Sequence, residues 1–145
     1  VLLQFNKSRF FSTINPAETK VAFIGLGNVG GKLAGSLIRN GFDVTVKDLD
    51  YDLCSEFEKK GATCGHGKPL AEIAAENDFV VTCLPHPTIS AKVVEGDGLS
   101  EDCLLKGLKT SGNKCKAWLE MSTTDASEIK RLGAKVLETS NSTVL

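Results

Sequence analysis

The sequence predicts an α/β fold, a doubly wound parallel sheet with helices on both faces, and three observations carry this prediction. A short, apolar, β-branched segment at residues 20–24 leads directly into a glycine-rich turn at 25–30. A helical pattern follows the turn, and a second strand pattern at 42–46 ends just before Asp48. Strand and helix patterns then alternate along the chain, which is typical of a parallel sheet buried between helices.

The glycine-rich turn at residues 25–30 (GLGNVG) has a physical reason for each glycine. Gly25 permits a tight turn, Gly27 lets a pyrophosphate approach the main chain, and Gly30 lets the helix pack close to the strand. The following helix offers free N–H groups and a positive dipole end to phosphates. Asp48 is placed to accept hydrogen bonds from ribose hydroxyls. Together they predict a Rossmann-like dinucleotide site; a glycine turn without a ligand is the alternative.

The loops that follow the strands should gather on one rim of the sheet. They are residues 25–30, Asp48, the segment 84–87, and the pair Ser122 and Thr123. In open α/β sheets, ligands bind outside the carboxyl ends of the strands, where the strand order reverses. The rim is therefore the expected position of the site.

Length and charge restrict the possible classes of protein. With 145 residues and 41% hydrophobic residues, the chain is expected to form one domain with its own core. No apolar run approaches the roughly 18 residues of a membrane-spanning helix. The net charge is −1 and no basic stripe is present, so neither a membrane nor nucleic acid is an expected partner.

The cysteine pattern argues against a metal site or a disulfide framework. The chain has five widely spaced cysteines, no CxxC pair and two histidines, which cannot complete a zinc pattern. We expect free thiols in a reducing compartment, with Cys83 in the core of its apolar strand. The five cysteines are Cys54, Cys64, Cys83, Cys103 and Cys115.

The first residues have a composition unlike that of the rest of the chain. Residues 1–17 contain basic, hydroxyl and aromatic residues and no acid, which resembles the tail of a mitochondrial transit peptide. A disordered polar leader is the alternative. The sequence does not begin with methionine, so we expect a processed chain or a piece of a longer one. The expected division is a leader over 1–19 and a dinucleotide-binding domain over 20–145, in mitochondria.

Further strand and helix patterns follow Asp48. The expected strands span residues 62–64, 78–84 and 117–121. The expected helices span residues 51–60, 69–76, 88–94 and 100–108, and a last helix begins near 125. Short oxygen-bearing side chains favour helix N-caps, and the candidates are Asp50 or Asp52, Ser100, and Thr124 or Asp125.

The last part of the chain allows two interpretations. The spacing of Ile129, Leu132 and Val136 favours a helix that continues to about residue 138. Alternatively, residues 134–138 form a strand.

Three stretches of the sequence carry a resemblance to a known family: residues 21–41 (VAFIGLGNVGGKLAGSLIRNG), 80–87 (VVTCLPHP) and 118–133 (WLEMSTTDASEIKRLG). They resemble the β-hydroxyacid dehydrogenases, a family that includes 3-hydroxyisobutyrate dehydrogenase and, more distantly, 6-phosphogluconate dehydrogenase. The likeness covers roughly residues 20 to 136 and is nearest to 3-hydroxyisobutyrate dehydrogenase-like proteins.

This resemblance implies roles for individual residues. Leu84 and Pro85 match a loop that lines the ribose rings, although they could simply end a strand. Ser122 and Thr123 match a Ser-Thr pair that approaches the substrate carboxylate and the nicotinamide, although both could be helix caps. The residues implied to bind the cofactor are Gly25, Leu26, Gly27, Asn28, Val29, Gly30, Asp48, Leu84, Pro85 and Ser122.

The choice of cofactor depends on the residues after the second strand. Asp48 stands where NAD-preferring members carry an acid, and it would repel the 2′-phosphate of NADP. Lys47 beside it could offset part of this repulsion. We expect NAD, with NADP as the alternative.

The family resemblance also implies parts that this sequence lacks. Family members continue into a glycine-rich substrate motif, a catalytic lysine and an all-helical second domain. Under the strand interpretation of the chain's end, residues 138–140 would stand where the substrate motif begins. The chain is expected to be truncated before that second domain, and Lys130 and Lys135 are expected to be surface charges.

The implied reaction of a full-length protein is hydride transfer between nicotinamide and a small 3-hydroxy acid. The chain itself is expected to bind dinucleotide without catalysis. The alternative is a non-catalytic dinucleotide-binding or interaction module.

Overall fold

The computed structural model describes residues 14–99, 102–110, 112–139 and 143–144. Within these ranges, six parallel strands form one sheet in the order β3-β2-β1-β4-β5-β6. The strands are β1 (Lys20–Ile24), β2 (Asp43–Lys47), β3 (Thr63–Cys64), β4 (Phe79–Thr82), β5 (Ala117–Glu120) and β6 (Thr143–Val144). The strand order reverses between β1 and β4, so the predicted doubly wound parallel sheet is confirmed.

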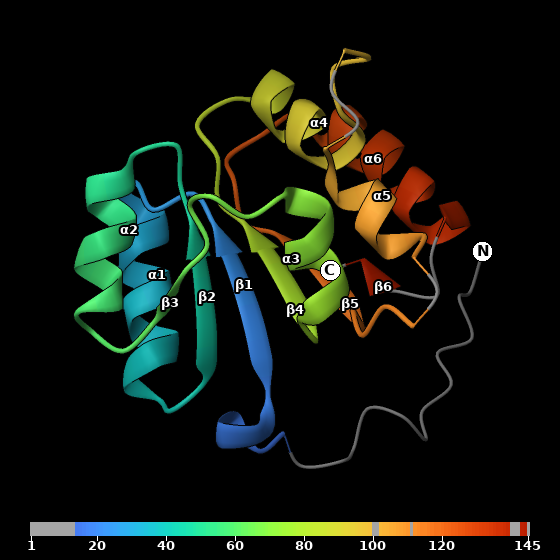
Figure 1. Ribbon diagram of the computed structural model, residues 1–145. Coiled ribbons are helices and arrows are strands. Elements are labelled where there is room, and N and C mark those ends of the chain that lie inside the picture. The colour runs from blue at the N-terminus through green and yellow to red at the C-terminus, as the bar shows by residue number, and fades with distance from the viewer. Residues whose placement is uncertain (1–13, 100–101, 111, 140–142, 145) are drawn as a thin grey trace.

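Helices cover both faces of this sheet. They are α1 (Asn28–Arg39), α2 (Tyr51–Glu58), α3 (Leu70–Glu76), α4 (Pro87–Glu95), α5 (Leu104–Leu108) and α6 (Ala126–Thr139). Figure 1 shows α1 and α2 together on one side of the molecule and α3, α4, α5 and α6 on the other. The predicted alternation of strands and helices is therefore confirmed.

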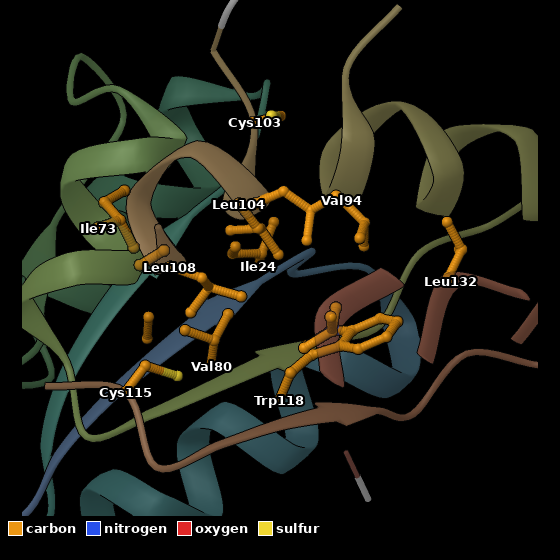
Figure 2. Close-up of a cluster of buried hydrophobic side chains, with 14 residues drawn as sticks. Ile24, Ile73, Val80, Val94, Cys103, Leu104, Leu108, Cys115, Trp118 and Leu132 are labelled. Atoms are coloured by element: carbon orange, nitrogen blue, oxygen red, sulfur yellow. The ribbon is translucent and has the colours of Figure 1, made fainter. Parts of the chain in front are cut away.

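Alternate side chains of the central strands supply two separate cores, because successive residues of a strand point to opposite faces. Val21 and Phe23 of β1 pack with α1 and α2, whereas Ala22 and Ile24 pack with the helices on the other face. Figure 2 shows this second core, in which Trp118 of β5 lies among aliphatic side chains from several helices. Burial on both faces explains why the strands read as continuous apolar runs.

Helix ends follow the predicted capping chemistry at two of the three positions. The Asp50 side chain accepts from the Asp52 N–H at 2.9 Å, so it caps α2. Asp125, rather than Thr124, caps α6, since its Oδ1 accepts from the N–H groups of Ser127 at 2.8 Å and Glu128 at 3.1 Å. These bonds satisfy donors that a helix leaves unpaired in its first turn.

The predicted helix over residues 100–108 begins too early. Helix α5 starts at Leu104, because Cys103 has extended backbone dihedrals (φ −151°, ψ 164°). The preceding Asp102 uses Oδ1 to accept from the Ala71 N–H at the start of α3, at 3.1 Å. The expected cap, Ser100, lies outside the described residues.

At the end of the chain, the helix interpretation is confirmed. Helix α6 runs to Thr139, so the alternative of a strand over residues 134–138 is wrong. Glu138 and Thr139 lie in this helix and not at the start of a substrate motif, while Ser140 is outside the described ranges. The two-residue strand β6, which pairs with β5, was not predicted.

The segment expected to form a leader divides into two parts. Residues 1–13 lie outside the described part of the chain. Pro16–Glu18 forms a 3-10 turn, and the next residue, Thr19, is buried and accepts at its carbonyl from the Asp43 N–H at 3.2 Å. No helix within the described ranges is both long and apolar enough to cross a bilayer.

Candidate functional site

The carboxyl ends of the three central strands and of β5 lie at one level. The Gly25 N–H donates to the Lys47 carbonyl at 2.9 Å, and the Cys83 N–H donates to the Ile24 carbonyl at 2.9 Å. Between β4 and β5, the N–H of Met121 donates to the carbonyl of Thr82 at 2.8 Å. The loops after these strands therefore leave the sheet together, and the expected rim of loops is present.

A cavity of about 920 Å³ lies over this rim. All but one of the predicted site residues line it: Gly25, Gly27, Asn28, Val29, Gly30, Asp48, Leu84, Pro85, Ser122 and Thr123. The exception is Leu26, whose side chain is buried in the core with α1 and α2. Its main-chain N–H nevertheless contributes to the site through Asp48.

The three glycines of the turn have different surroundings. Gly25 has φ +95°, and a Cβ there would lie 2.2 Å from the Cys83 carbonyl oxygen. A Cβ at Gly30 would lie 2.1 Å from the Gly25 carbonyl oxygen. Both positions therefore need glycine for the fold itself, the first for its left-handed dihedral and the second for close helix–strand contact.

Gly27 is different, because a Cβ built there meets nothing within 4 Å. It is the N-cap of α1 and no side chain caps this helix end. The residue is exposed and lines the cavity. An open space in front of uncapped N–H groups is the arrangement that a pyrophosphate requires, so the residues fit a dinucleotide.

Asp48 is fixed at the edge of the cavity by the main chain around it. Its Oδ2 accepts from the Leu26 N–H at 2.7 Å, and its Oδ1 accepts from the Asp50 N–H at 3.0 Å. The Asp48 N–H points to the Cys54 sulfur at 3.2 Å. Burial raises the pKa of the Cys54 thiol to about 11, so at neutral pH this neighbour stays uncharged.

Ser122 connects the loops after β4 and β5. Its hydroxyl accepts from the Leu84 N–H at 2.7 Å and donates to Glu120, whose Oε1 also accepts from the Ser122 N–H at 2.8 Å. Because Asp125 caps α6, the interpretation of Ser122 as a helix cap is wrong. Thr123 lies exposed on the rim.

The ammonium group of Lys47, the residue before Asp48, is held by main-chain carbonyl groups. It donates to three main-chain carbonyl oxygens, those of Gly65 at 3.3 Å, His66 at 3.1 Å and Lys68 at 2.6 Å. Lys47 is half-buried and lines the cavity. Its charge is therefore directed at the turn before α3.

The apolar wall of the cavity was not predicted from the sequence. Leu49 follows Asp48 directly and is 95% exposed. Its position next to the predicted acid could have indicated from the sequence that it lines the cavity. The other members come from helices whose packing no local pattern reveals. The apolar residues of this wall are Leu49, Leu53, Leu70, Ile89 and Val93.

Cys83 meets the expectation only in part. It is half-buried after the end of β4, where it packs against the core formed with α1 and α2 and also lines the cavity. Burial, and then the charge of Glu120, raise the pKa of its thiol. None of the five cysteines, all of which lie in the described part of the chain, forms a disulfide. Among the described residues, no group of three His, Cys, Asp or Glu side chains is arranged to hold a metal ion.

Known proteins resemble this chain in both sequence and structure. Rat mitochondrial 3-hydroxyisobutyrate dehydrogenase is 32% identical over 83% of the chain, which spans 33% of that protein. The human cytokine-like nuclear factor N-PAC is 27% identical over 86% of the chain, which spans 21% of its length.

In structure, 3-hydroxyisobutyrate dehydrogenase of Salmonella typhimurium superposes with a TM-score of 0.69 at 20% identity. The match covers 88% of this chain and 40% of that one. At this identity the likeness shows the fold.

The family match agrees with the geometry of the site. Residues 20–144 match the family described as the NAD binding domain of 6-phosphogluconate dehydrogenase, and this range begins at the first residue of β1. It includes the turn, the acid and the Ser-Thr pair at the carboxyl edge. The chain belongs to this family of NAD-binding domains, in a form that resembles the corresponding part of 3-hydroxyisobutyrate dehydrogenase.

Proposed function

We propose that the chain is the cofactor-binding part of an oxidoreductase that transfers hydride between a nicotinamide cofactor and a small 3-hydroxy acid. The observation that carries this proposal is the open space at Gly27, in front of the uncapped N-terminus of α1 and beside the fixed Asp48 carboxylate. The named activity of the rat relative supports the reaction class.

The cofactor-binding residues follow from their places around the cavity. The pyrophosphate would lie against the main chain of residues 25–30, and Asp48 would accept from the adenosine ribose hydroxyls. Leu84 and Pro85 would line the ribose rings. When bound, the nicotinamide ring supplies the hydride acceptor or donor.

Ser122 and Thr123 are proposed to stand on the substrate side of the cavity. Since the Ser122 hydroxyl already bridges the Leu84 N–H and Glu120, its position is set before any ligand arrives. A group held in this way orients a ligand without the entropy loss of ordering the side chain on binding.

NAD is the proposed cofactor in preference to NADP. The Asp48 carboxylate would face a 2′-phosphate as a like charge at a partly buried position. The neighbouring cation does little to reduce this repulsion, because the Lys47 ammonium is surrounded by three carbonyl oxygens.

Catalysis is proposed to require a further part of the full-length protein. The chain spans about a third of the length of the rat relative. Lys135 is paired with Glu95, and Lys130 is exposed on the same helix, so neither is placed at the cavity as an acid–base group. The chain alone should therefore bind dinucleotide and turn over no hydroxy acid.

Titration calorimetry with NADH, paired with an absorbance assay for oxidation of 3-hydroxyisobutyrate, tests this proposal. We expect saturable binding of one NADH per chain and no turnover. Absence of dinucleotide binding would contradict the proposed function. Turnover by the chain alone would contradict the proposal that catalysis requires a further part of the full-length protein.

A second candidate is a non-catalytic dinucleotide-binding or interaction module. It is favoured by the relative whose name is that of a nuclear factor and not of a dehydrogenase. Turnover by the full-length gene product would exclude this candidate. Dinucleotide binding by the full-length product without oxidation of any small 3-hydroxy acid would support it.

The proposed location is mitochondrial, as the rat relative's name states for that protein. The basic, acid-free composition of residues 1–17 supports it. Import of the radiolabelled full-length product into isolated mitochondria, followed by protease treatment, tests the location. Protected product is expected, and complete digestion would contradict it.

A further inference from the structure

We propose that Lys47 is a positioning residue that fastens the turn before α3, residues 65–68, to the end of β2. By doing so it places Leu70 in the apolar wall of the cavity, against which the base of the cofactor would bind. This inference rests on the proposed function, because it concerns the same cavity. It adds Lys47 to the residues on which cofactor binding depends, beside the glycine turn and Asp48.

The contacts of the Lys47 ammonium account for all its donors. A lysine ammonium has three N–H groups, and Nζ lies within hydrogen-bond distance of the carbonyl oxygens of Gly65, His66 and Lys68, at 3.3, 3.1 and 2.6 Å. The side chain is half-buried. Carbonyl dipoles that converge on one cation hold the turn in a single arrangement, because their oxygens would repel one another without it.

The same turn is tied to the chain around Asp48 by other groups. The Gly65 N–H donates to the Val46 carbonyl at 2.8 Å. His66 Nδ1 lies 3.1 Å from the Asp48 carbonyl oxygen, and the His66 ring packs edge-on against Tyr51 at 5.3 Å between ring centroids. Lys47 is thus the charged centre of a contact between the end of β2 and the turn.

This contact places one part of the cavity wall. Leu70 begins α3 two residues after Lys68 and lines the cavity with Leu49 and Leu53. An apolar wall next to a ribose-binding carboxylate suits a flat heteroaromatic base, which gains from burial against aliphatic side chains. If the turn is released, Leu70 loses its anchor on the N-terminal side, although the bond between Asp102 and the Ala71 N–H remains. Asp48 keeps its bonds to Leu26 and Asp50.

The arrangement also separates two possible roles for Lys47. A lysine that read a 2′-phosphate would need free N–H groups, whereas this ammonium has its three donors engaged. Lys47 should therefore strengthen binding of NAD and of NADP by the same factor, through the adenosine half that the two cofactors share.

The test compares Lys47→Met with Lys47→Arg and with Lys59→Met, a control at an exposed lysine just after α2. Calorimetry measures binding of NAD, NADP, ADP-ribose and nicotinamide mononucleotide. For Lys47→Met we expect a loss on the order of tenfold for the three adenosine-containing ligands, since a preorganised wall would be lost. Nicotinamide mononucleotide should be unaffected, Lys47→Arg should retain part of the affinity, and Lys59→Met should behave as wild type.

Several outcomes would overturn the inference. A loss of affinity in Lys47→Met that is confined to NADP would assign Lys47 to the 2′-phosphate. Unchanged binding of all four ligands would show that the apolar wall does not depend on Lys47. An equal loss of affinity for nicotinamide mononucleotide would indicate general damage to the fold. Amide hydrogen exchange without ligand is the second measurement. In Lys47→Met we expect faster amide exchange at residues 65–73 and unchanged exchange in β1. Equal changes in exchange across the whole chain would contradict the role of Lys47 in holding the turn. If the wild type bound none of the ligands, the proposed function would fail and the base-wall role with it.

Discussion

The Asp48 Oδ2 atom accepts a hydrogen bond from the main-chain N–H of Leu26 at 2.7 Å, across 22 positions of sequence. This bond joins the end of β2 to the glycine turn after β1. The proposed ribose acceptor and the proposed pyrophosphate cradle are therefore one preorganised unit. Such preorganisation lowers the entropy lost when a ligand binds.

Replacing Gly27 with alanine should separate binding from folding. A Cβ at this position meets no protein atom within 4 Å, and φ is −59°, so the folded chain should accept it. The same methyl group would occupy the space proposed for the pyrophosphate. We expect an unchanged melting temperature and a loss of NADH affinity of about 100-fold or more, equivalent to about 3 kcal/mol.

Gly30→Ala is the matched control within the same turn. Its Cβ would lie 2.1 Å from the Gly25 carbonyl oxygen, so we expect destabilisation of at least about 1–3 kcal/mol, as for overpacked cores. Thermal unfolding and calorimetry on both variants check the pair. A destabilised Gly27→Ala chain, or one that binds NADH normally, would contradict the assignment.

Asp48→Asn should change the preference between cofactors. An amide keeps one acceptor oxygen for the Leu26 N–H and loses only the exposed bond from the Asp50 N–H, so the fold should persist. The charge that opposes a 2′-phosphate is removed. We expect NAD affinity to fall about tenfold, or about 1.4 kcal/mol, and NADP affinity to fall less or to rise. Parallel titrations with both cofactors measure the ratio, and an unchanged ratio would mean that Asp48 does not contact the ribose.

The turn and the acid could be predicted because their geometry depends on a few neighbouring residues. Gly25 and Gly30 are required by local backbone conformation and by one close helix–strand approach. The apolar wall could not be predicted, since Leu70 and Ile89 meet at the cavity only through the packing of helices distant in sequence.

Two further differences have similar causes. The start of α5 depends on the contact of Asp102 with α3, which no local periodicity encodes. Strand β6 has two residues, too few for the alternation that marks a strand, and it lacks the glycines that bound the equally short β3 in the sequence.

The buried contact between Thr82 and Trp118 should contribute to stability. Trp118 Nε1 donates to Thr82 Oγ1 at 2.9 Å, and both side chains are almost completely buried. Thr82→Val keeps the shape but leaves the indole N–H without an acceptor, which costs about 1–3 kcal/mol. Urea unfolding monitored by tryptophan fluorescence measures the change, with Thr110→Val at an exposed site as the control. Equal unfolding midpoints for the two variants would contradict this role.

The ion pair between α4 and α6 should make stability depend on acid pH. Arg131 donates to both oxygens of Glu95, at 2.6 and 3.0 Å, and Lys135 donates to the same carboxylate. The Arg131 guanidinium lowers the pKa of Glu95 from 4.5 to about 2. Because the folded-state pKa is the lower one, this stabilisation is complete above about pH 4.5 and is lost as the pH falls towards 2.

Urea unfolding of wild type and Glu95→Gln between pH 2 and pH 7 checks this dependence. The free energies of unfolding should differ at pH 7 and converge as the pH falls through this window. Salt should reduce the difference, since the pair is partly exposed. A difference that stays constant across the range would show that the carboxylate charge is not the cause.

The location of the cofactor can be observed directly by NMR. In a titration of the ¹⁵N-labelled chain with NADH, we expect the largest amide shift changes at Leu26, Gly27, Asn28 and Asp48, and we expect Gly27→Ala to abolish them. Saturable changes confined to other parts of the molecule, or no changes at these four amides, would contradict the assignment of the dinucleotide to the loops that follow β1 and β2 on the rim.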